Sequence, residues 1–558
     1  MPCVWFLVAS LARAQEANDA VLDALEVELA RTLAAWEGAE DAPWYFGYRV
    51  DDVTSWDVVG RYGALDHSTL ARSRVIDVDV RAGDRHRDST HPLRNERWDF
   101  GVTELSHGVL PIDDDRLALR AEVWRLTDEA TRAARERIVK VRGEQRVLVA
   151  ETDGSDDFGP PARYVDVEPV QFGSFDPRPW EDVVEVVSAV VDRAPWVEDS
   201  SVSVSVRRGT RWIVTSEGTR LREPWRHARI AIEAHARADD GMDVSLYRWK
   251  DVGDPAELPD ETTLLAWGAD TGADLRDLLA APVGEPYAGP VLLRGRAAGV
   301  FVHEVLGHRV EGHRQKKEDE GRTFRQLVGH SLLPPDISIV DDPTLATYAG
   351  EYLNGHYRWD DQGMPAARAT LVDRGVFRGF LMGRSPIRDF PDSNGHGRAE
   401  SGLRPVPRMA NTLLSTTRPR SDSELRRMLL DEVRRQGLAY GVIVDELAGG
   451  FTLTGRVTPN AFNLRAGTSW RVYADGRPDE LIRGIDLVGT PLIALGNVLA
   501  AGDDPAVFNG YCSAESGGVP NAAIAPSLLI RRLEMQLKEK GQARPPVLPR
   551  PDPRPKEG

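Results

Sequence analysis

The sequence predicts an α+β protein in which an α/β N-terminal domain is followed by a β-rich C-terminal domain. Three observations lead to this class. In the first half, amphipathic helical patterns alternate with runs in which apolar and polar residues alternate. After residue 282 the chain changes to short strand-like segments with many Gly and Pro. The length of 558 residues also exceeds what one hydrophobic core normally organises.

The N-terminal domain is expected over residues 15–281. Apolar residues at steps of three and four predict helices, and strict alternation predicts strands. Residues 201–248 predict a meander of strands, in which His227 and His235 are interpreted as structural or surface residues. Helices are predicted at residues 22–36, 113–141, 183–191 and 261–281, strands at residues 45–61 and 73–84, and a loop at residues 154–161.

The C-terminal domain is expected over residues 282–540, after a linker rich in Pro and Gly at residues 282–286. It contains few helical patterns besides residues 421–436 and the segment that carries the histidines described below. The last residues, 541–558, are rich in proline and are predicted to be a disordered tail. No internal repeat is present in the sequence.

Composition and charge exclude some classes of function. The net charge of −17, without any cluster of Lys and Arg, argues against a nucleic-acid-binding surface. No apolar run reaches the 18 residues that a membrane-spanning helix requires. We therefore expect neither a nucleic-acid partner nor a membrane span.

The first 14 residues resemble part of a secretion signal. Residues 3–11 are apolar, and the following A-R-A fits a small-x-small cleavage site before Gln15. The basic n-region is missing, so the segment is either a truncated signal peptide or the apolar face of a first helix. We favour the truncated signal peptide, which implies an exported or periplasmic protein rather than a cytoplasmic one.

The most informative stretch is V-H-E-V-L-G-H-R-V-E-G-H, residues 302–313. Imidazole is a good zinc ligand, and a carboxylate beside the metal can take a proton from water. His303 and His308 are five residues apart, so a straight helix would place them roughly 140° apart. A π-bulge, or a helix that ends at Gly307, would bring the two rings together. A core helix with incidental histidines is the alternative.

A zinc site needs a further ligand, and Cys512 is the best candidate in the sequence. The chain has two cysteines, and removal of a leader would leave Cys512 as the only thiol. A metal would protect such a thiol from side reactions. The alternative is that Cys512 is a small buried apolar residue, which is the more common role of a free cysteine.

Several stretches together resemble the TldD/PmbA family of metallopeptidases. The first half is similar to the family's N-terminal domain only loosely, with T-S-E-G-T at residues 215–219 as its best local match. The blocks that carry the resemblance are V-F-V-H-E-V-L-G-H-R-V-E-G (300–312), I-V-D-D-P-T-L (339–345), Y-R-W-D-D-Q-G-M-P-A (357–366), G-V-F-R-G-F-L (375–381), G-R-A-E-S (397–401), V-P-R-M-A-N-T (406–412), E-L-A-G-G (446–450), I-R-G-I-D-L-V-G (482–489) and G-Y-C-S-A-E-S-G-G-V-P (510–520).

The resemblance implies a metallopeptidase that hydrolyses peptide bonds of unfolded or extended peptides. It implies one zinc ion per chain, bound by His303, His308 and Cys512, with Glu304 as general base on the zinc-bound water. This chain keeps the H-E-x-x-x-H residues that partner subunits of the family lack. It departs from the family at Arg309, where members tend to carry a small residue, and near His313, where they tend to carry an acidic one.

Other roles follow less directly. Glu311 is either a residue that orients a ligand or a solvated carboxylate, and His313 could compete as a ligand. An extended peptide could add to a sheet edge, with Arg408 and Asn411 as polar contacts. The resemblance also implies a dimer, formed with a second copy or with a family paralogue, that encloses the site.

Three other functions remain open at this stage. The first is a non-catalytic subunit that binds peptides or a partner within a TldD/PmbA-type complex. The second is a cysteine hydrolase that uses Cys512 with a histidine. The third is a structural zinc site, which usually has four protein ligands.

Overall fold

The computed structural model describes residues 19–93, 103–145, 153–316, 322, 324–455 and 461–538. The predicted leader at residues 1–14 and the Pro-rich tail at residues 541–558 lie outside these described residues. The chain leaves the first large sheet and enters the second at strand β8 (Tyr287–Leu293), just after the predicted linker.

A long antiparallel meander forms the centre of the N-terminal half. Among the described residues, seven strands form this sheet in the order β3-β2-β1-β5-β6-β4, with β7 also paired to β6. β1 and β2 are joined by a turn at Tyr62 and Gly63, both at positive φ. The strands are β1 (Tyr45–Arg61), β2 (Ala64–Arg81), β3 (Ser106–Val109), β4 (Val165–Val167), β5 (Asp199–Thr215), β6 (Arg220–Arg237) and β7 (Asp243–Val252).

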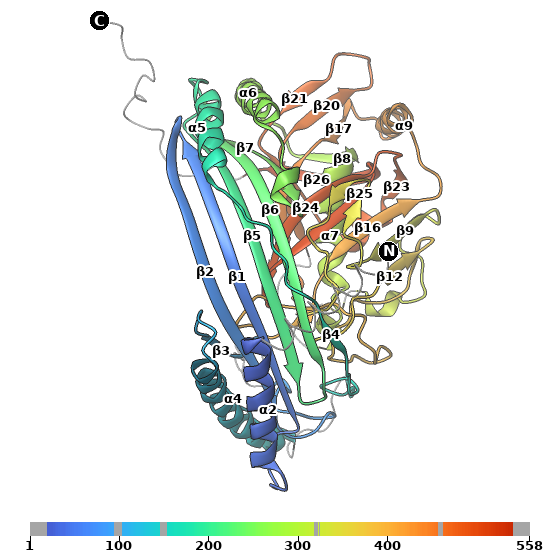
Figure 1. Cartoon of the computed structure of the whole chain (residues 1–558). Coiled ribbons are helices and arrows are strands. Elements are labelled where there is room, and N and C mark those ends of the chain that lie inside the picture. Colours follow the sequence, from blue (N-terminus) through green and yellow to red (C-terminus); the bar gives the residue numbers. More distant parts are fainter. Residues whose placement is uncertain are drawn as a thin grey trace, which may run out of the picture.

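Two pairs of helices cover one face of this sheet, one pair at each end (Figure 1). Helices α2 (Ala20–Trp36) and α4 (Arg116–Gln145) pack on the end that carries Tyr48, and α5 (Arg178–Asp192) and α6 (Glu261–Ala280) pack on the end that carries Val58. Side chains alternate along a strand, so even-numbered residues of β1 point to this face. They contribute to the hydrophobic core under α2 and α4 and to the core under α5 and α6. None of the described helices is both long and apolar enough to cross a membrane.

The predicted helices and strands of this half are found, with shifted ends. β1 has the predicted bounds, whereas β2 begins nine residues before its predicted start at residue 73. Residues 64–73 are exposed on both faces, so they lack the apolar alternation on which the prediction depended. α4 begins at Arg116 because Asp115 precedes it and accepts a hydrogen bond from the Ala118 N–H over 2.8 Å. His227 pairs with Asp251 and His235 with Glu233, as structural or surface residues do.

Two further sheets organise the described part of the C-terminal half. One has nine strands in the order β18-β19-β22-β26-β8-β17-β20-β21, with β23 also paired to β26, and the other has six in the order β13-β12-β9-β16-β25-β24. Their strands are β9 (Ile337–Asp341), β12 (Ala369–Asp373), β13 (Val376–Phe377), β16 (Asn411–Thr416), β17 (Tyr440–Val444), β18 (Leu447–Thr452), β19 (Phe462–Ala466), β20 (Ser469–Tyr473), β21 (Glu480–Ile482), β22 (Ile485–Gly489), β23 (Val498–Ala501), β24 (Ala506–Ala514), β25 (Gly517–Ala525) and β26 (Leu528–Leu537). Two hairpins, β10 (Thr347–Tyr348) with β11 (Glu351–Tyr352) and β14 (Gly397–Arg398) with β15 (Val406–Pro407), complete the strands.

Helix α7 (Gly295–Val305) is the buried centre of the C-terminal half, because all but the second of its eleven residues are buried. It packs against β24 and β25 of one sheet and against β18 and β19 of the other. Gly299 permits this, because a Cβ there would lie 3.1 Å from the Ala523 carbonyl oxygen. The remaining helices are α8 (His313–Lys316), α9 (Asp422–Arg435), which begins with the capping box of Ser421 and Glu424, and α10 (Pro491–Gly496).

A buried ion-pair cluster joins the two halves on the other face of the N-terminal sheet. Arg49 of β1 contacts Asp77 of β2 and Asp361 of the C-terminal half, and its guanidinium donates to the carbonyls of Ala399 and Glu400. Asp77 accepts hydrogen bonds from the backbone N–H of Gly402 over 2.7 Å and from His107 over 2.8 Å. The cluster therefore fixes the N-terminal sheet against the loop that contains G-R-A-E-S.

Candidate metal centre

The predicted break between the two histidines is present. α7 ends at Val305, and a 3-10 turn over Gly307–Arg309 follows, with Leu306 between them. This turn directs His308 back toward His303, and the two ring centroids lie 5.1 Å apart with their planes at 88°. The reason for glycine at 307 differs from the predicted one. A Cβ there would lie 1.9 Å from Met409 Sδ, so close packing rather than backbone angle requires it.

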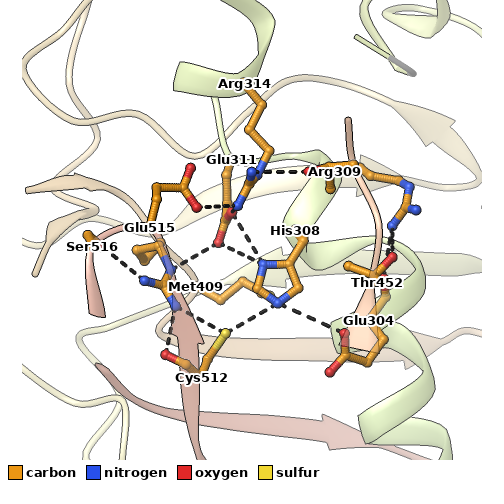
Figure 2. Close-up of polar contacts among 12 residues, drawn as sticks. Glu304, His308, Arg309, Glu311, Arg314, Met409, Thr452, Cys512, Glu515 and Ser516 are labelled. Atoms are coloured by element: carbon orange, nitrogen blue, oxygen red, sulfur yellow. Dashed lines mark hydrogen bonds and ion pairs between the residues drawn. The ribbon is translucent and has the colours of Figure 1, made fainter. Parts of the chain in front are cut away.

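Three side chains from distant parts of the chain converge at this break. The ligand atoms of His303, His308 and Cys512 all lie within 4.8 Å of one another, and all three residues are buried. Cys512 is on β24, and its Sγ lies 3.3 Å from His308 Nε2 (Figure 2). The pairing of β24 with β25, which packs against α7, brings this sulfur across about two hundred residues of sequence.

The charges of these groups support one another. Burial opposes ionisation of the Cys512 thiol, but the charges of His308 and His303 hold its pKa well below the usual value. Burial likewise opposes protonation of His308, whereas Cys512 and Glu311 raise its pKa well above the ordinary range. The sulfur is therefore held as a thiolate, which is the form that binds metals.

Glu304 lies next to these three side chains, and one of its carboxylate oxygens accepts no hydrogen bond from them. Its side chain is buried, and its Oε2 has no hydrogen-bond partner among the described residues. The same oxygen lies 3.9 Å from His308 Nε2. β18 packs beside it, since a Cβ on Gly450 would lie 3.3 Å from Glu304 Cγ. An unpaired buried carboxylate oxygen is costly unless a ligand or water completes it, so this oxygen indicates a binding position.

Glu311 is fully buried and holds the outer nitrogen of His308. Its carboxylate lies 3.3 Å from His308 Nδ1, and it also contacts Arg314 and Arg408. Burial raises the pKa of Glu311, but the charges of His308, Arg314 and Arg408 outweigh this and bring it to about 2. With Nδ1 fixed, Nε2 faces the sulfur, as expected for a carboxylate that orients a metal-binding histidine.

Arg408 and Asn411 lie where no peptide could contact them. Both side chains are fully buried. Arg408 donates to Cys512 Sγ over 3.2 Å and to the Cys512 carbonyl over 2.7 Å. Asn411 bonds to the backbone of Gly355, Asp342 and Leu345. The structure contradicts the prediction that they are substrate contacts: Arg408 supports the sulfur, and Asn411 binds both ends of the loop that carries β10 and β11.

The residues at which the sequence departs from the family pattern point away from the three ligand atoms. Arg309 is buried and donates to the carbonyls of Glu304 and Leu453. His313 contacts Glu515, and it is outside the group of ligand atoms found among the described residues. Sequence reasoning gave no role to Glu515, which also binds Arg314 over 2.8 Å. Glu515 lies three residues after Cys512, in the block G-Y-C-S-A-E-S-G-G-V-P that resembles the family. This position is the one feature of the sequence that could have indicated its role.

The donor set fits zinc. Two imidazoles and one thiolate are ligands that zinc accepts, and three protein ligands leave a fourth tetrahedral position open. The unpaired Glu304 oxygen lies at the same break in the helix. A structural zinc site would be expected to have a fourth protein ligand, and the group found among the described residues has three.

Comparison with known proteins covers the part of the chain that contains these residues. Residues 286–537 match the family model described as the PmbA/TldA metallopeptidase C-terminal domain. This part of the chain is therefore similar to the C-terminal domain of TldD/PmbA metallopeptidases. The match contains every residue of the centre described above.

Curated relatives are identical to this chain at about a quarter of the aligned residues. A metalloprotease from Methanothermobacter thermautotrophicus is 26% identical over 338 residues, which cover 60% of this chain and 69% of that protein. A metalloprotease TldD homolog from Haemophilus influenzae is 27% identical over 256 residues, 45% of this chain and 48% of that protein. A zinc metalloprotease TldD homolog from Saccharolobus solfataricus is 22% identical over 256 residues, 45% of this chain and 52% of that protein.

Solved structures extend the similarity to the N-terminal half at the level of the fold. TldE from Thermococcus kodakarensis superposes with a TM-score of 0.58 at 12% identity, over 92% of this chain and 99% of that one. A protein from Thermotoga maritima, described as a modulator of a DNA gyrase, gives 0.60 at 15% identity, over 92% and 100%. The α+β fold predicted from the sequence is therefore confirmed.

Proposed function

We propose that this protein is a zinc-dependent metallopeptidase that hydrolyses peptide bonds of unfolded or extended peptides. The observation that carries the proposal is the convergence of His303, His308 and Cys512 within 4.8 Å, beside a buried Glu304 oxygen that has no hydrogen-bond partner among the described residues. The names of the curated relatives support the same class of reaction.

Each residue has a distinct part in this proposal. His303, His308 and Cys512 hold one zinc ion, which when bound supplies Lewis acidity for the scissile carbonyl and lowers the pKa of a coordinated water. Glu304 accepts the proton of the attacking water and passes it to the leaving amine. Glu311 keeps the His308 ring in the orientation that presents Nε2. Arg408 keeps the sulfur in place and ionised.

The edge of β18 is the surface that best fits an extended peptide. β18 is the terminal strand of its sheet, and its other side pairs with no strand that the structure describes. Leu453 N–H donates to the carbonyl of Ala461, the residue just before β19, so it faces the paired side of the strand. By alternation, the peptide groups of Gly450 and Thr452 face the open side. Because Gly450 also lies against Glu304, a peptide paired there would run past the general base.

The decisive test combines metal content with one conservative variant. Zinc is measured in the dialysed wild type and in Glu304→Gln, and both are assayed with unstructured fluorogenic peptides. We expect about one zinc per chain in both proteins and a rate loss of at least about a hundredfold in Glu304→Gln. Glu446→Gln, which changes an exposed carboxylate nearby, is the matched control and should keep full activity. A metal-free active wild type, or an active Glu304→Gln, would refute the proposal.

A cysteine hydrolase is the second candidate, because one arrangement favours it. Cys512 Sγ, His308 Nε2, His308 Nδ1 and Glu311 form a continuous chain of contacts, as a nucleophile, base and orienting carboxylate would. Two other features fit a metal site better than a cysteine hydrolase. The second imidazole, His303, has no task in such a triad, and the Arg408 donor lowers the nucleophilicity of the sulfur.

Inhibition separates these two functions. The metallopeptidase is inactivated by a chelator and restored by zinc, and zinc protects Cys512 from alkylation. The cysteine hydrolase keeps its activity in the chelator and loses it on alkylation. A chain without peptidase activity under all of these conditions, but with bound peptide, would be the non-catalytic subunit.

A further inference from the structure

Arg309 is a buried arginine that the proposed mechanism does not use. It is 2% exposed and lies in the 3-10 turn after α7, directly beside His308. Burying a guanidinium is costly unless its N–H groups are hydrogen-bonded, so its acceptors indicate what it does. These acceptors lie on two separate elements, the end of α7 and the edge strand β18.

The acceptor on α7 is the main chain of Glu304. Because α7 ends at Val305, the Glu304 carbonyl is among the last four of the helix, which have no partner within it. Arg309 Nη1 donates to this carbonyl over 3.1 Å. Arginine close to the C-terminus of a helix can satisfy such carbonyls. This bond therefore holds the peptide group of the residue that we propose as general base.

The acceptors on the other side belong to β18 and the residue that follows it. The same Nη1 donates to Thr452 Oγ1 (Figure 2). Nη2 donates to the Leu453 carbonyl over 3.1 Å. Leu453 also donates its N–H to Ala461, so its peptide groups face the paired side of the strand. Arg309 thus contacts the strand without occupying its open edge, and its planar fork bridges two elements as a lysine could not.

The pairing of β18 with β19 does not by itself fix the strand along its whole length. The register shifts between Leu447 and Gly450, where Gly449 has a φ of 113°, so the regular pairing runs only from Gly450 to Thr452. A bulge of this kind bends a strand and changes its twist. An edge strand that is irregular at one end depends on contacts at the other end, and Arg309 contacts that other end.

We propose that Arg309 is a positioning residue for substrate binding, which fixes the open edge of β18 relative to the Glu304 carboxylate. This inference rests on the proposed function, in which an extended peptide pairs with β18. A single nitrogen, Nη1, joins the Glu304 carbonyl to the Thr452 hydroxyl, so the helix end and the strand cannot separate without breaking a hydrogen bond. The departure from the family pattern at residue 309 then serves recognition of the main chain of the peptide.

Peptide affinity in an inactive background tests this role without an assay of activity. The zinc-loaded full chain with Glu304→Gln is titrated with a fluorescein-labelled unstructured decapeptide, and fluorescence anisotropy gives the Kd. Adding Arg309→Met should weaken binding roughly tenfold, because the strand must then be ordered when the peptide binds, and should leave the zinc content unchanged. Arg384→Met is the matched control, since Arg384 is also buried but donates to the Pro160 carbonyl. It should lower stability without changing the Kd.

Two further measurements separate positioning from general damage to the fold. The same peptide with all of its amides N-methylated cannot donate to β18, so it should bind weakly, and Arg309→Met should weaken it no further. Thr452→Val removes one acceptor and leaves the arginine in place. It should weaken binding of the unmethylated peptide about fivefold, and it decides the question if Arg309→Met does not fold.

The outcomes distinguish this inference from the proposed function. An unchanged Kd in Arg309→Met or in Thr452→Val, an equal loss for both peptides, or a loss of zinc in Arg309→Met would overturn the positioning role. A wild type that hydrolyses no peptide, while the pattern of affinities is as expected, would refute the peptidase and support the role of Arg309 in binding. If the Glu304→Gln protein binds no peptide at all, both the site at β18 and the inference are overturned.

Discussion

The Arg408 guanidinium donates a hydrogen bond to Cys512 Sγ over 3.2 Å from a position with no solvent exposure. The same side chain contacts Glu311 at 3.3 Å, and Glu311 in turn contacts His308. One buried arginine is therefore connected to both sides of the proposed centre: directly to the sulfur, and through a carboxylate to an imidazole. Arg408 does not reach the substrate, so we describe it as a positioning residue.

Removing this arginine should weaken zinc binding. Arg408→Met keeps the length of the side chain but removes the Arg408 donor to Cys512 and one of the positive charges beside Glu311. Loss of such outer contacts typically costs 10- to 100-fold in metal affinity. Competition with a chromophoric chelator measures the affinity without any assay of activity. Arg378→Met, at an exposed arginine, is the control. Unchanged zinc affinity in Arg408→Met would refute the positioning role.

The charge of Glu311 is predicted to stabilise the fold. Glu311 is fully buried among His308, Arg314 and Arg408, so Glu311→Gln removes the negative charge that these three groups share. Breaking one partner of such a cluster costs about 3–5 kcal/mol of unfolding free energy. Urea unfolding of the metal-free protein gives the value. A loss below about 1 kcal/mol would mean that water or relaxation replaces the carboxylate.

Gly307 is predicted to be required by packing. In Gly307→Ala the new Cβ would lie 1.9 Å from Met409 Sδ, and Met409 is buried, so either the sulfur or the turn that carries His308 must move. We expect a loss of about 1–3 kcal/mol in stability together with reduced zinc content. The double variant Gly307→Ala/Met409→Ala removes the opposing atoms. It should therefore lose less than the sum of the two single variants.

The sequence predicts the metal-binding residues of the candidate centre better than it predicts the residues around them. The five-residue spacing of His303 and His308 already required a broken helix, and Gly307 marked the place. Arg408 was predicted to contact substrate, because a polar residue in a quoted block gives no indication of burial. For the same reason, the sequence did not show whether its partner Glu311 is buried or exposed. Such contacts depend on how β24 and α7 pack, which is a property of the whole domain.

The N-terminal half shows the same limit in its strands. The meander was predictable because Val and Ile alternate over long stretches of β5 and β6, where one face is buried. Residues 64–73 of β2 carry no such alternation, and all ten are exposed. A strand segment without a buried face cannot be predicted from a pattern that depends on burial.

The joint between the two halves predicts a dependence on acid. Burial raises the pKa of Asp77, but Arg49 and the hydrogen bonds from His107 and Gly402 outweigh this and bring it from 3.8 to about 2. A lowered pKa in the folded state stabilises the protein above the unfolded value and loses that contribution as pH falls from about 4 to 2. The shift corresponds to roughly 2 kcal/mol.

Asp77→Asn should therefore be less stable than wild type at pH 7, and the difference should shrink as the pH approaches 2. Urea unfolding of both proteins across this range measures it. Parallel curves, with a difference that does not depend on pH, would show that Asp77 acts through packing rather than through its charge.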